Sequence, residues 1–562
     1  MSPSPGPRPV PPRAASLPRA RRRTRIAVIG AGPAGLTSAK QALAEGHEVV
    51  VYEKNADLGG IWDPASGGAY PGVRMQSSRM SFPFSDFPPR GVDDFPTLPQ
   101  MHAYLRSYAE AFGVLPVCRF GHRVVRVARE ADGWRVTARR EGPEQEAAGA
   151  RGSSEVFDAV MVASGELWEP RLPESLPDPA APVRVRTPKS YRGAADFAGR
   201  RVLVVGGGVS GADIAAELSD TSARVDWSVR GRALFLPRDC GGVYNDALFS
   251  YAGRVALEEM PYRDYLAWLG ELLPEYMAMY RETGLLPADG FHGAVQVNEK
   301  AVPRVHRGRI TVRPAFERFT PGGAAVLADG SEESYDDVVL CLGYGMPDYG
   351  FIEGFRREDL YEHHFYRHDP TLAVINTPVG TEGFGTACPY FETIAAWALA
   401  VFAGRAALPD AEAMAAWCAR HPGRPDDRRY LDCWLETIRI GLAAGTLPDP
   451  RTSFAAYWRL VSGTVAPSRL RPGGPAVARP ATYDGLFDLD HLRHRILAAL
   501  PLSDRDGLLA AGDIGRTDYE AALLVPDGRV LPPWLPYRQR RRSRLPTAAP
   551  GPGPQAFRSP VP

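Results

Sequence analysis

Three glycines at a fixed spacing follow a short apolar run near the start of the chain. Residues 25–29 read Arg-Ile-Ala-Val-Ile, a helical stretch covers about 36–45, and a second apolar run over 47–52 ends in Glu53. The glycines between the first run and the helix are Gly30, Gly32 and Gly35. A strand, a glycine loop, a helix and a second strand ending in an acid form the unit that binds a dinucleotide. The diphosphate rests on free N–H groups at the helix start, and the acid accepts hydrogen bonds from the ribose hydroxyls.

Each glycine has a separate task in such a loop. Gly30 permits the tight turn, Gly32 lets the backbone approach the diphosphate, and Gly35 allows the helix to pack close to the strand. Pro33 and Ala34 lie between them at the start of the helix. We expect all five residues to bind the cofactor.

The pattern returns near residue 200. Residues 201–205 form an apolar run, a helical stretch covers 212–218, and the next predicted strand, 224–229, is followed by Arg230 and Arg232 rather than by an acid. The residues predicted to bind the second cofactor here are Gly206, Gly208, Val209, Ser210 and Gly211. An acid would repel a 2′-phosphate on the ribose, whereas guanidinium groups pair with it. This unit therefore favours NADPH over NADH, unless both arginines are solvated surface residues.

One acid-terminated and one arginine-terminated unit in the same chain imply two different cofactors. NADPH at the second site needs a hydride acceptor. FAD at the first site supplies one, because a flavin takes a hydride and passes electrons on singly or in pairs. The predicted fold class is therefore α/β, with two Rossmann-like dinucleotide-binding domains.

Composition excludes several other classes of protein. The 562 residues carry 66 Lys and Arg against 65 Asp and Glu, a net charge of +1, which argues against a nucleic-acid binder. The six cysteines form no Cys-x-x-Cys pair, which excludes a disulfide scaffold, a thiol zinc site and a dithiol reductase. No apolar run reaches the ~18 residues of a membrane span, and no secretory signal is expected. We therefore expect a cytoplasmic protein that binds neither nucleic acid nor a membrane.

The chain divides into a folded middle and two polar ends. Residues 1–23 and 538–562 are rich in Pro and Arg and lack the apolar residues needed to order themselves. Between them lie the two predicted dinucleotide units. The aromatic-rich stretch 247–281 is either a lid or ordinary core packing, and core packing is favoured.

Further motifs appear in a fixed order around the two glycine loops. They are Leu58-Gly59-Gly60-Ile61-Trp62, Tyr70-Pro-Gly-Val-Arg74, Ser85-Asp-Phe-Pro88, Met161-Val-Ala-Ser-Gly165 and Cys341-Leu-Gly343-Tyr344. In this order, from about residue 25 to about 480, the chain resembles the flavin-containing monooxygenases, the FAD- and NADPH-dependent class B group. The resemblance implies an NADPH domain inserted into an FAD domain. We therefore expect the first part of the FAD domain over 24–190, the NADPH domain over 191–334, the second part of the FAD domain over 335–450, and an extension that packs on the FAD domain over 451–537. The second part is expected to begin with a strand over 335–340.

The resemblance also implies site residues beyond the loops. The further cofactor-binding residues are Lys54, Gly60, Ile61, Trp62, Arg74, Ser164, Gly165 and Gly343. Two residues are expected in catalysis. Gln76 stands where the family has an Asn near the flavin, and it carries the same amide one methylene further out. Tyr344 is expected to touch the substrate or the nicotinamide, although it and Arg74 have an equal claim as structural residues.

Three positions depart from the family pattern. The family fingerprint FxGxxxHxxxY ends at Tyr191, but its Gly position is Val183 and its His position is Thr187. A Gln of the closing helix is Ile394. Because the longer Baeyer–Villiger fingerprint requires the histidine, Thr187 weakens that assignment. Together the changes suggest a reshaped substrate side.

The reaction implied by the resemblance has two halves. NADPH reduces FAD, and reduced FAD forms with O₂ a C4a-hydroperoxyflavin that oxygenates a soft nucleophile. The protein excludes water and positions hydrogen-bond donors, and it needs no metal or nucleophile of its own. The cluster His363, His364 and His368 matches no closed metal site, so no metal is predicted.

Several classes of small-molecule substrate fit this reaction with O₂. N-oxygenation (N-hydroxylation) of an amine or amino acid leads, and S-oxygenation follows. The content of Ala, Arg, Gly and Pro resembles that of a GC-rich bacterial genome, where such enzymes serve natural product biosynthesis. The alternatives are a Baeyer–Villiger enzyme acting on a ketone, a plain NADPH oxidase, and a flavin-binding protein with a redox-sensing or structural role.

Overall fold

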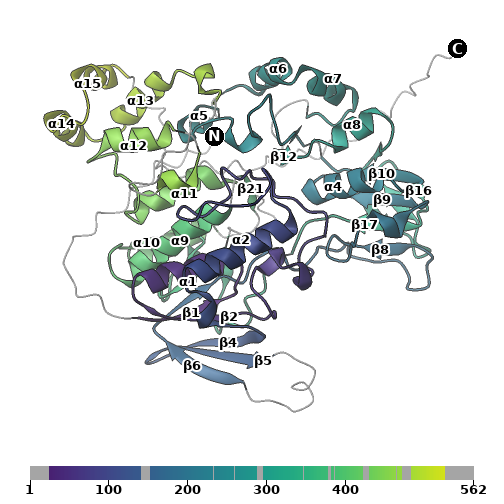
Figure 1. Ribbon diagram of the computed structural model, residues 1–562, viewed down its shortest axis with the longest axis horizontal. Helices are drawn as coiled ribbons and strands as arrows, with labels where there is room; N and C mark the ends of the chain where they lie inside the picture. The colour runs from purple at the N-terminus through teal and green to yellow at the C-terminus, as the bar shows by residue number, and fades with distance from the viewer. Residues whose placement is uncertain are drawn as a thin grey trace.

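Two parallel β-sheets organise the chain, each with a glycine loop after one of its inner strands (Figure 1). The computed structural model describes residues 24–140, 152–231, 233–257, 260–287, 295–345, 347–376, 381–384, 387–421, 429–463, 465–470 and 482–525. The expected disordered tails and Arg232 lie outside these described residues.

The first sheet is built around β1, which leads into the first glycine loop. Its order is β18 (Leu360–Tyr361), β19 (Phe365–Tyr366), β20 (Leu372–Val374), β7 (Ala159–Val162), β1 (Arg25–Ile29), β2 (Glu48–Tyr52) and β3 (Cys118–Arg119). The strands from β20 to β3 run parallel, and β18 and β19 form an antiparallel edge. The sheet therefore joins strands from both sides of the inserted domain, as the predicted fold class requires.

The second sheet is parallel throughout and carries the second glycine loop after β9. Its order is β13 (Thr311–Arg313), β10 (Arg224–Ser228), β9 (Arg201–Val205), β17 (Asp337–Leu340) and β8 (Arg184–Arg186). The strand that we expected to open the second part of the FAD domain is β17, and it pairs with β8 and β9. The expected limits of 191 and 334 are therefore too narrow, because strands outside both of them complete this sheet.

Side chains of the first sheet alternate between two hydrophobic cores. Val28 and Met161 point to one face, and Ala27 and Val160 point to the other. Helices α1 (Pro33–Ala44), α2 (Leu98–Ala111) and α9 (Ala387–Phe402) cover the first face, and the antiparallel sheet of β4 (His122–Glu130), β5 (Gly133–Arg140) and β6 (Ser153–Phe157) covers the second. Both faces of the parallel sheet are thus buried, as such sheets require.

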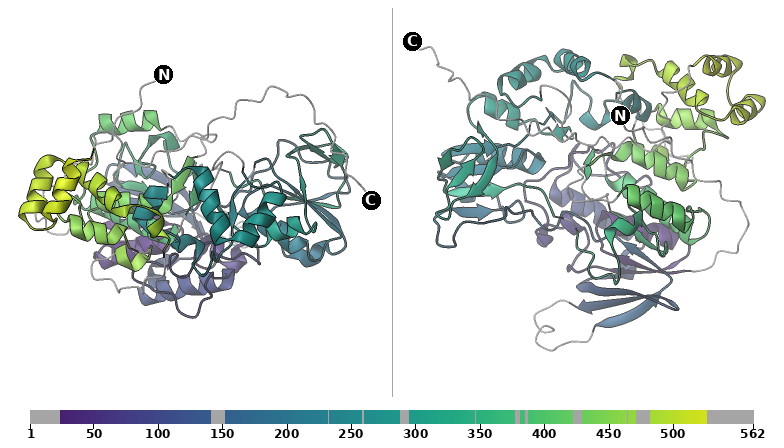
Figure 2. Two further views of the ribbon diagram at one scale, coloured as in Figure 1. Left: turned by 90° about the horizontal axis from the view of Figure 1, so that it is seen from above. Right: turned by 180° about the vertical axis from the view of Figure 1, so that it is seen from behind.

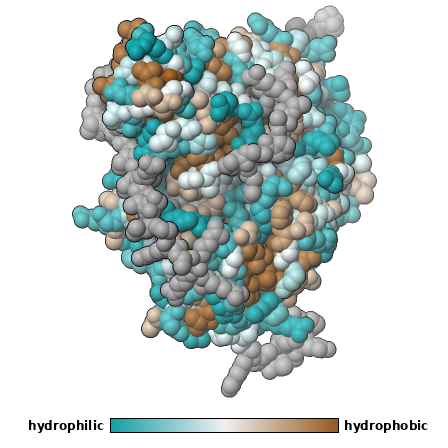
Figure 3. Space-filling view, turned by 60° about the vertical axis from the view of Figure 1, so that its left-hand side comes forward, coloured by the Kyte–Doolittle hydropathy of each residue, from teal (hydrophilic) through white to brown (hydrophobic). Residues whose placement is uncertain are grey.

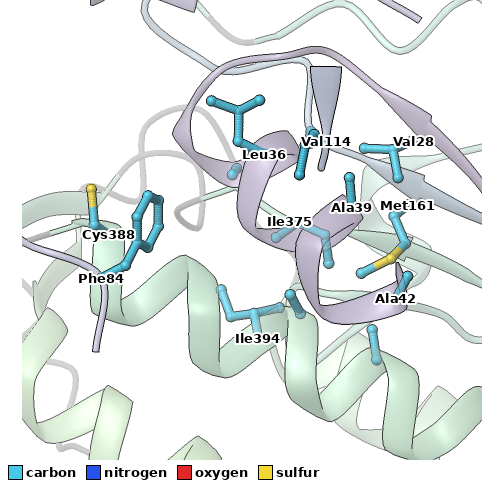
Figure 4. Packing of buried hydrophobic residues seen from close by; sticks show 14 of the residues in the cluster. Val28, Leu36, Ala39, Ala42, Phe84, Val114, Met161, Ile375, Cys388 and Ile394 are labelled. Atoms are coloured by element: carbon cyan, nitrogen blue, oxygen red, sulfur yellow. The ribbon is translucent and has the colours of Figure 1, made fainter. Parts of the chain in front are cut away.

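Helix α1 packs directly on α9 (Figure 4). Leu36, Ala39 and Ala42 on α1 and Ile394 on α9 belong to one cluster, and all four are fully buried. A Gln side chain in this apolar contact would need hydrogen-bond partners to offset its desolvation. The departure at Ile394 is therefore explained by core packing.

The inserted domain adds helices around the second sheet. They are α4 (Val209–Leu218), α5 (Tyr251–Leu257), α6 (Tyr262–Leu272), α7 (Pro274–Glu282) and α8 (Ala301–His306). The aromatic residues Tyr265, Trp268 and Tyr280 are buried in its core, and the Tyr280 hydroxyl accepts a hydrogen bond from the Phe235 amide at 2.9 Å. Core packing of the aromatic stretch is confirmed for these residues.

The C-terminal helices form a separate cluster at the opposite end of the molecule from the second sheet (Figures 1 and 2). They are α11 (Cys433–Ala443), α12 (Phe454–Val461), α13 (Leu489–Ala498), α14 (Leu502–Ala510) and α15 (Arg516–Leu523). Their core contains Trp434 of α11 and also Tyr251 of α5, which belongs to the inserted domain. The extension was expected to pack on the FAD domain, and its helix α13 also contacts α5 of the inserted domain. Figure 3 shows hydrophobic residues at the top of the molecule. Leu524, directly after α15, is 83% exposed.

Short elements complete the described fold. The remaining strands are β11 (Phe235–Leu236), β12 (Gln296–Val297), β14 (Phe316–Phe319), β15 (Ala325–Leu327), β16 (Glu332–Glu333), β21 (Thr381–Phe384) and β22 (Arg429–Asp432), and the remaining α-helix is α10 (Ala411–Arg420). Within the described ranges, no helix is both long enough and apolar enough to cross a membrane.

Alanine substitutions at two helical glycines are predicted to change stability in opposite directions. A Cβ atom at Gly35 of α1 would lie 1.8 Å from the Gly30 carbonyl oxygen, whereas one at Gly507 of α14 would meet nothing within 4 Å. Gly35→Ala should cost about 1–3 kcal/mol or more through overpacking, and Gly507→Ala should gain about 0.5–1 kcal/mol through helix propensity. Calorimetric unfolding of the two variants checks this, and equal thermal midpoints would contradict the described packing.

Acid is predicted to weaken the first domain through His364. Its ring is buried, with one nitrogen 2.9 Å from the Val374 carbonyl oxygen and the other 3.1 Å from the Tyr390 hydroxyl. Burial lowers the pKa of His364 from 6.5 to about 4. The imidazole of the unfolded chain therefore binds a proton near pH 6.5, whereas that of the folded chain stays neutral. The free energy of unfolding falls as the pH falls below 6.5.

The expected loss between pH 7 and pH 5 is about 2 kcal/mol. His364→Gln should remove this part of the pH dependence, and His368→Gln, at an exposed neighbouring ring, should retain it. Thermal unfolding at both pH values measures the difference, and identical slopes for the two variants would refute the assignment.

Candidate cofactor-binding and active site

The first glycine loop joins the carboxyl ends of three strands. Gly30 has φ +108°, and its amide donates to the Tyr52 carbonyl oxygen at 2.8 Å. A Cβ atom at Gly30 would lie 2.4 Å from the Ala163 carbonyl oxygen, and one at Gly35 would lie 1.8 Å from that of Gly30. The protein's own packing therefore requires glycine at both positions. This agrees with the tight turn predicted at Gly30 and the close packing of helix and strand predicted at Gly35.

Gly32 and Gly208 are not required in this way. A Cβ atom at Gly32 would meet Gly60 Cα only at 3.7 Å, and one at Gly208 would meet nothing within 4 Å. Each is the N-cap residue of its helix, α1 or α4, and neither helix has a side-chain cap among the described residues. At both helix starts the first backbone N–H groups have no side-chain cap, and no atom of the described residues crowds the glycine beside them. This arrangement suits a diphosphate.

The second loop repeats the contacts of the first. A Cβ atom at Gly206 would lie 2.2 Å from the Cys341 carbonyl oxygen, and one at Gly211 would lie 2.0 Å from that of Gly206. Val209 and Ser210 form the first turn of α4 between them. The two predicted units are therefore alike in detail as well as in sequence.

Glu53 is buried at the end of β2, beside the first loop. Its carboxylate accepts hydrogen bonds from the Ala31 amide at 2.7 Å and the Asn55 amide at 2.8 Å. Burial raises the pKa of Glu53, and these two bonds oppose the rise. Each oxygen keeps a lone pair, so the carboxylate can also accept from ribose hydroxyls.

Lys54 turns toward an aromatic ring. Its ammonium lies 3.9 Å from the centroid of the Trp168 ring, and the ammonium of Lys189 lies 5.6 Å from the same ring. Burial lowers the pKa of Lys54. Trp168 therefore attracts both ammonium groups by cation–π interaction.

The motif containing Gly60 lies against the first loop. The Gly59 amide donates to the Ala31 carbonyl oxygen at 2.8 Å, and a 3₁₀ turn over Gly60–Trp62 follows. Ile61 and Trp62 are half-buried. Gly60 thus lies next to Gly32 at the start of α1, and Ile61 and Trp62 follow it in the same turn.

Ser164 and Gly165 follow β7 at the same edge of the sheet. The Ser164 hydroxyl is buried without a hydrogen-bond partner among the described residues. The Gly165 amide donates to Asn376 Oδ1 at 3.1 Å, and Asn376 Nδ2 donates to the Tyr349 hydroxyl at 3.0 Å. An unpaired hydroxyl at this edge fits a polar ligand such as the sugar part of FAD.

Gly343 and Tyr344 lie where the chain crosses back from the inserted domain. The Gly343 carbonyl oxygen accepts from the Arg171 amide at 2.9 Å, and that of Tyr344 accepts from Arg171 Nε at 2.6 Å. Pro170 and Tyr344 form an antiparallel bridge. Burial raises the pKa of Tyr344. The segment that leaves the FAD domain, at residues 170–171, is therefore hydrogen-bonded to the segment that returns to it, at residues 343–344.

Arg74 and Gln76 lie in a segment that runs between the two domains. The exposed Arg74 guanidinium donates to Asp93 Oδ2 at 2.9 Å and to the Phe95 carbonyl oxygen at 3.2 Å, so its described partners belong to the protein. Gln76 is half-buried and has no hydrogen bond to any described residue. Its amide is therefore available to a ligand, and its predicted role remains a prediction.

Arg230 is exposed just beyond the end of β10. The adjacent backbone approaches the second loop, since a Cβ atom at Gly207 would lie 3.4 Å from the Gly231 carbonyl oxygen. This is the place where the ribose of a dinucleotide bound to the second loop would lie.

The fingerprint departures have structural explanations. Val183 is buried and packs against Gly323, where a Cβ atom would lie 2.6 Å from Val183 Cγ1. The Thr187 carbonyl oxygen accepts from the amide of Tyr191 at 3.0 Å, and the Tyr191 ring lies edge-on to that of Tyr70. Thr187 thus forms the turn that buries Tyr191 without supplying an imidazole.

The three histidines do not converge. His364 is buried, whereas His368 Nε2 lies 3.6 Å from Asp359 Oδ2. Across the part of the chain that the structure describes, no group of three His, Cys, Asp or Glu residues could hold a metal ion.

Sequence reasoning missed several buried or half-buried polar residues at this site. Asn376 holds the Gly165 amide, and Glu166 beside it is a carboxyl whose pKa burial raises to about 8. Asp213 accepts from the Tyr70 hydroxyl at 2.8 Å and from Asn298 Nδ2 at 2.6 Å. No local spacing marks these residues, because their partners lie far away in the sequence.

Comparison with known proteins agrees with this geometry. The family model for flavin-binding monooxygenase-like proteins matches residues 23–438. Flavin-containing monooxygenase 5 of Cavia porcellus is 31% identical, with 84% of this chain and 92% of the relative covered. Dimethylaniline monooxygenase (N-oxide-forming) 2 of Mus musculus is 31% identical, with 70% and 76% covered.

Solved structures share the fold. S-allyl-L-cysteine S-oxygenase from Allium sativum superposes with a TM-score of 0.55 at 18% identity, with 89% of this chain and 99% of that chain covered. Cyclohexanone monooxygenase from Rhodococcus sp. Phi1 bound to NADP⁺ gives 0.53 at 19% identity, with 70% and 88% covered. With its two glycine loops and the family match over most of its length, the chain belongs to the flavin-binding monooxygenase-like family of FAD- and NADPH-dependent monooxygenases.

Proposed function

We propose that this enzyme transfers one oxygen atom of O₂ to the nitrogen of an amine or amino acid. The carrying observation is the pair of loops at Gly32 and Gly208, each open to a dinucleotide at an uncapped helix start. Bound FAD supplies the hydride acceptor and the oxygen-activating centre. NADPH, a proton, O₂ and the amine then give NADP⁺, water and the N-oxygenated product.

The protein's own residues position the cofactors. Backbone N–H groups at the starts of α1 and α4 bind the two diphosphates, and Glu53 accepts from the FAD ribose. Arg230 pairs with the 2′-phosphate of NADPH. The amide of Gln76 would donate a hydrogen bond to the bound flavin, and Tyr344 would contact the substrate or the nicotinamide. Arg74, Ser164 and Lys54 complete the FAD site in this proposal.

Nitrogen is favoured over a ketone carbon by two observations. Thr187 supplies no imidazole at the position where the Baeyer–Villiger fingerprint has one. One relative that covers 70% of the chain is named as N-oxide-forming. Sulfides are the second substrate class, because sulfur is also a soft nucleophile. A role in bacterial natural product biosynthesis and a cytoplasmic location belong to the same proposal.

The proposal is tested with FAD-loaded enzyme, NADPH and O₂, and with a tertiary amine, an amino acid, a thioether and a cyclic ketone in turn. We expect N-oxide or hydroxylamine formation in step with NADPH consumption. An ester from the ketone as the main product, or H₂O₂ equal to NADPH with every substrate, would overturn it.

Arg230→Ala is predicted to weaken NADPH use selectively. Loss of one charge-assisted pair with the 2′-phosphate should raise KM for NADPH about tenfold and leave that for NADH within about twofold. Arg263→Ala, at an exposed arginine of α6 in the same domain, is the matched control. Equal effects on both nucleotides would show that Arg230 is only a surface residue.

Gln76→Ala is predicted to uncouple the enzyme. Without the amide, the ratio of H₂O₂ released to NADPH consumed should rise several-fold with saturating amine, whereas Gln76→Asn should stay close to the parent enzyme. Bound FAD per chain, read from absorbance, must be equal in the three proteins. An unchanged ratio in Gln76→Ala would remove this residue from the catalytic role.

A further inference from the structure

A buried carboxylate of the inserted domain contacts the segment that carries Gln76. Asp246 lies in a 3₁₀ turn over Asn245–Ala247 and is 5% exposed. Its Oδ2 accepts a hydrogen bond from the Ser78 amide at 2.5 Å and another from the Ser81 hydroxyl. Ser78 and Ser81 are fully buried, so neither donor has water as an alternative partner.

Ser78 is the centre of the turn that follows Gln76. Its carbonyl oxygen accepts from the Ser81 amide at 2.9 Å and from the Phe82 amide at 3.0 Å. Its side-chain oxygen accepts from the Met80 amide at 3.3 Å. These bonds give the turn a fixed shape of its own. Asp246 attaches this turn, which begins two residues after Gln76, to the inserted domain.

The other side of Gln76 is tied to the same domain. The Met75 amide donates to the Pro96 carbonyl oxygen at 2.8 Å, and the Met75 carbonyl oxygen accepts from Arg238 Nε at 3.4 Å. Arg238 is itself fixed by Glu299, at 2.9 and 2.6 Å. Gln76 thus lies between two anchors, and the inserted domain supplies a partner at each.

We propose that Asp246 is a positioning residue, which fixes the Gln76 segment against the inserted domain and so holds the Gln76 amide in register with the nicotinamide that this domain binds. The inference rests on the role proposed above for Gln76. The Gln76 amide can fulfil the proposed role only where the nicotinamide and the flavin meet. The two cofactors are bound by different domains, so the domains must be held in a fixed relation there. A direct bond from the NADPH-binding domain to the turn beside Gln76 couples these two positions.

Asp246→Ala removes the acceptor of two buried donors, whereas Asp246→Asn keeps an oxygen at the same place. The matched control is Asp484→Ala. Asp484 is likewise buried, accepts the Ser250 amide at 3.0 Å through one oxygen, and contacts no residue of the Gln76 segment in the described structure. Ser81→Ala, which removes only one donor, serves where Asp246→Ala does not fold.

The first readout needs no cofactor. In FAD-free protein, amide hydrogen exchange of the peptide that contains Ser78 should become at least about tenfold faster in Asp246→Ala, and stay near the parent rate in Asp246→Asn and Asp484→Ala. The second readout is the H₂O₂ released per NADPH in the loaded enzyme, which should rise several-fold in Asp246→Ala or Ser81→Ala only.

Unchanged exchange at Ser78 in Asp246→Ala, or equal changes in Asp246→Ala and Asp484→Ala, would overturn the inference. Failure of the underlying proposal looks different. If Gln76→Ala leaves the H₂O₂ ratio unchanged, the role of Gln76 is wrong. If Gln76→Ala raises the ratio and Asp246→Ala does not, the inference about Asp246 alone is wrong.

Discussion

The structure depends on one kind of close contact, that between a glycine and a backbone carbonyl oxygen at the carboxyl edge of a sheet. At Gly35 and Gly211 this contact leaves no room for a Cβ atom. It brings a helix against the strand before it, so that the helix begins at the edge of the sheet with its first N–H groups directed outward. The open backbone at Gly32 and Gly208 is usable by a ligand only because the two closed positions set the helices there.

The parts of the fold that local sequence specifies were predicted correctly. Each dinucleotide unit is complete within about 30 residues, and strand, turn and helix signals reinforce one another over that distance. The strand over Asp337–Leu340 was assigned to the wrong sheet because its apolar composition suits either sheet. Its place is decided by its neighbours β8 and β9, which are distant in the sequence. Composition alone carries no information on that choice.

The candidate site divides in the same way. Glu53 lies at the end of β2 beside the first glycine loop, as its spacing predicted, and Gly60, which the resemblance indicated, lies next to Gly32. Asp246 could not be found from the sequence, because 165 residues separate it from Ser81 and no motif contains either one. Arg74 shows that a motif can also suggest a contact that the structure does not contain. It belongs to a motif from which cofactor binding was predicted, yet its described partners are Asp93 and a backbone oxygen. A motif predicts the region of the fold in which a residue lies, whereas tertiary contacts decide its hydrogen-bond partners.

The paired crossings between the domains have an evolutionary consequence. The chain leaves the FAD sheet beside Arg171 and returns beside Gly343, and these two points are joined by a hydrogen bond of 2.9 Å. An inserted domain whose ends touch adds little loop-closure entropy to its host, whatever its own length. A whole dinucleotide-binding domain can therefore be gained, exchanged or enlarged by recombination at this single point without breaking the order of strands in the first sheet.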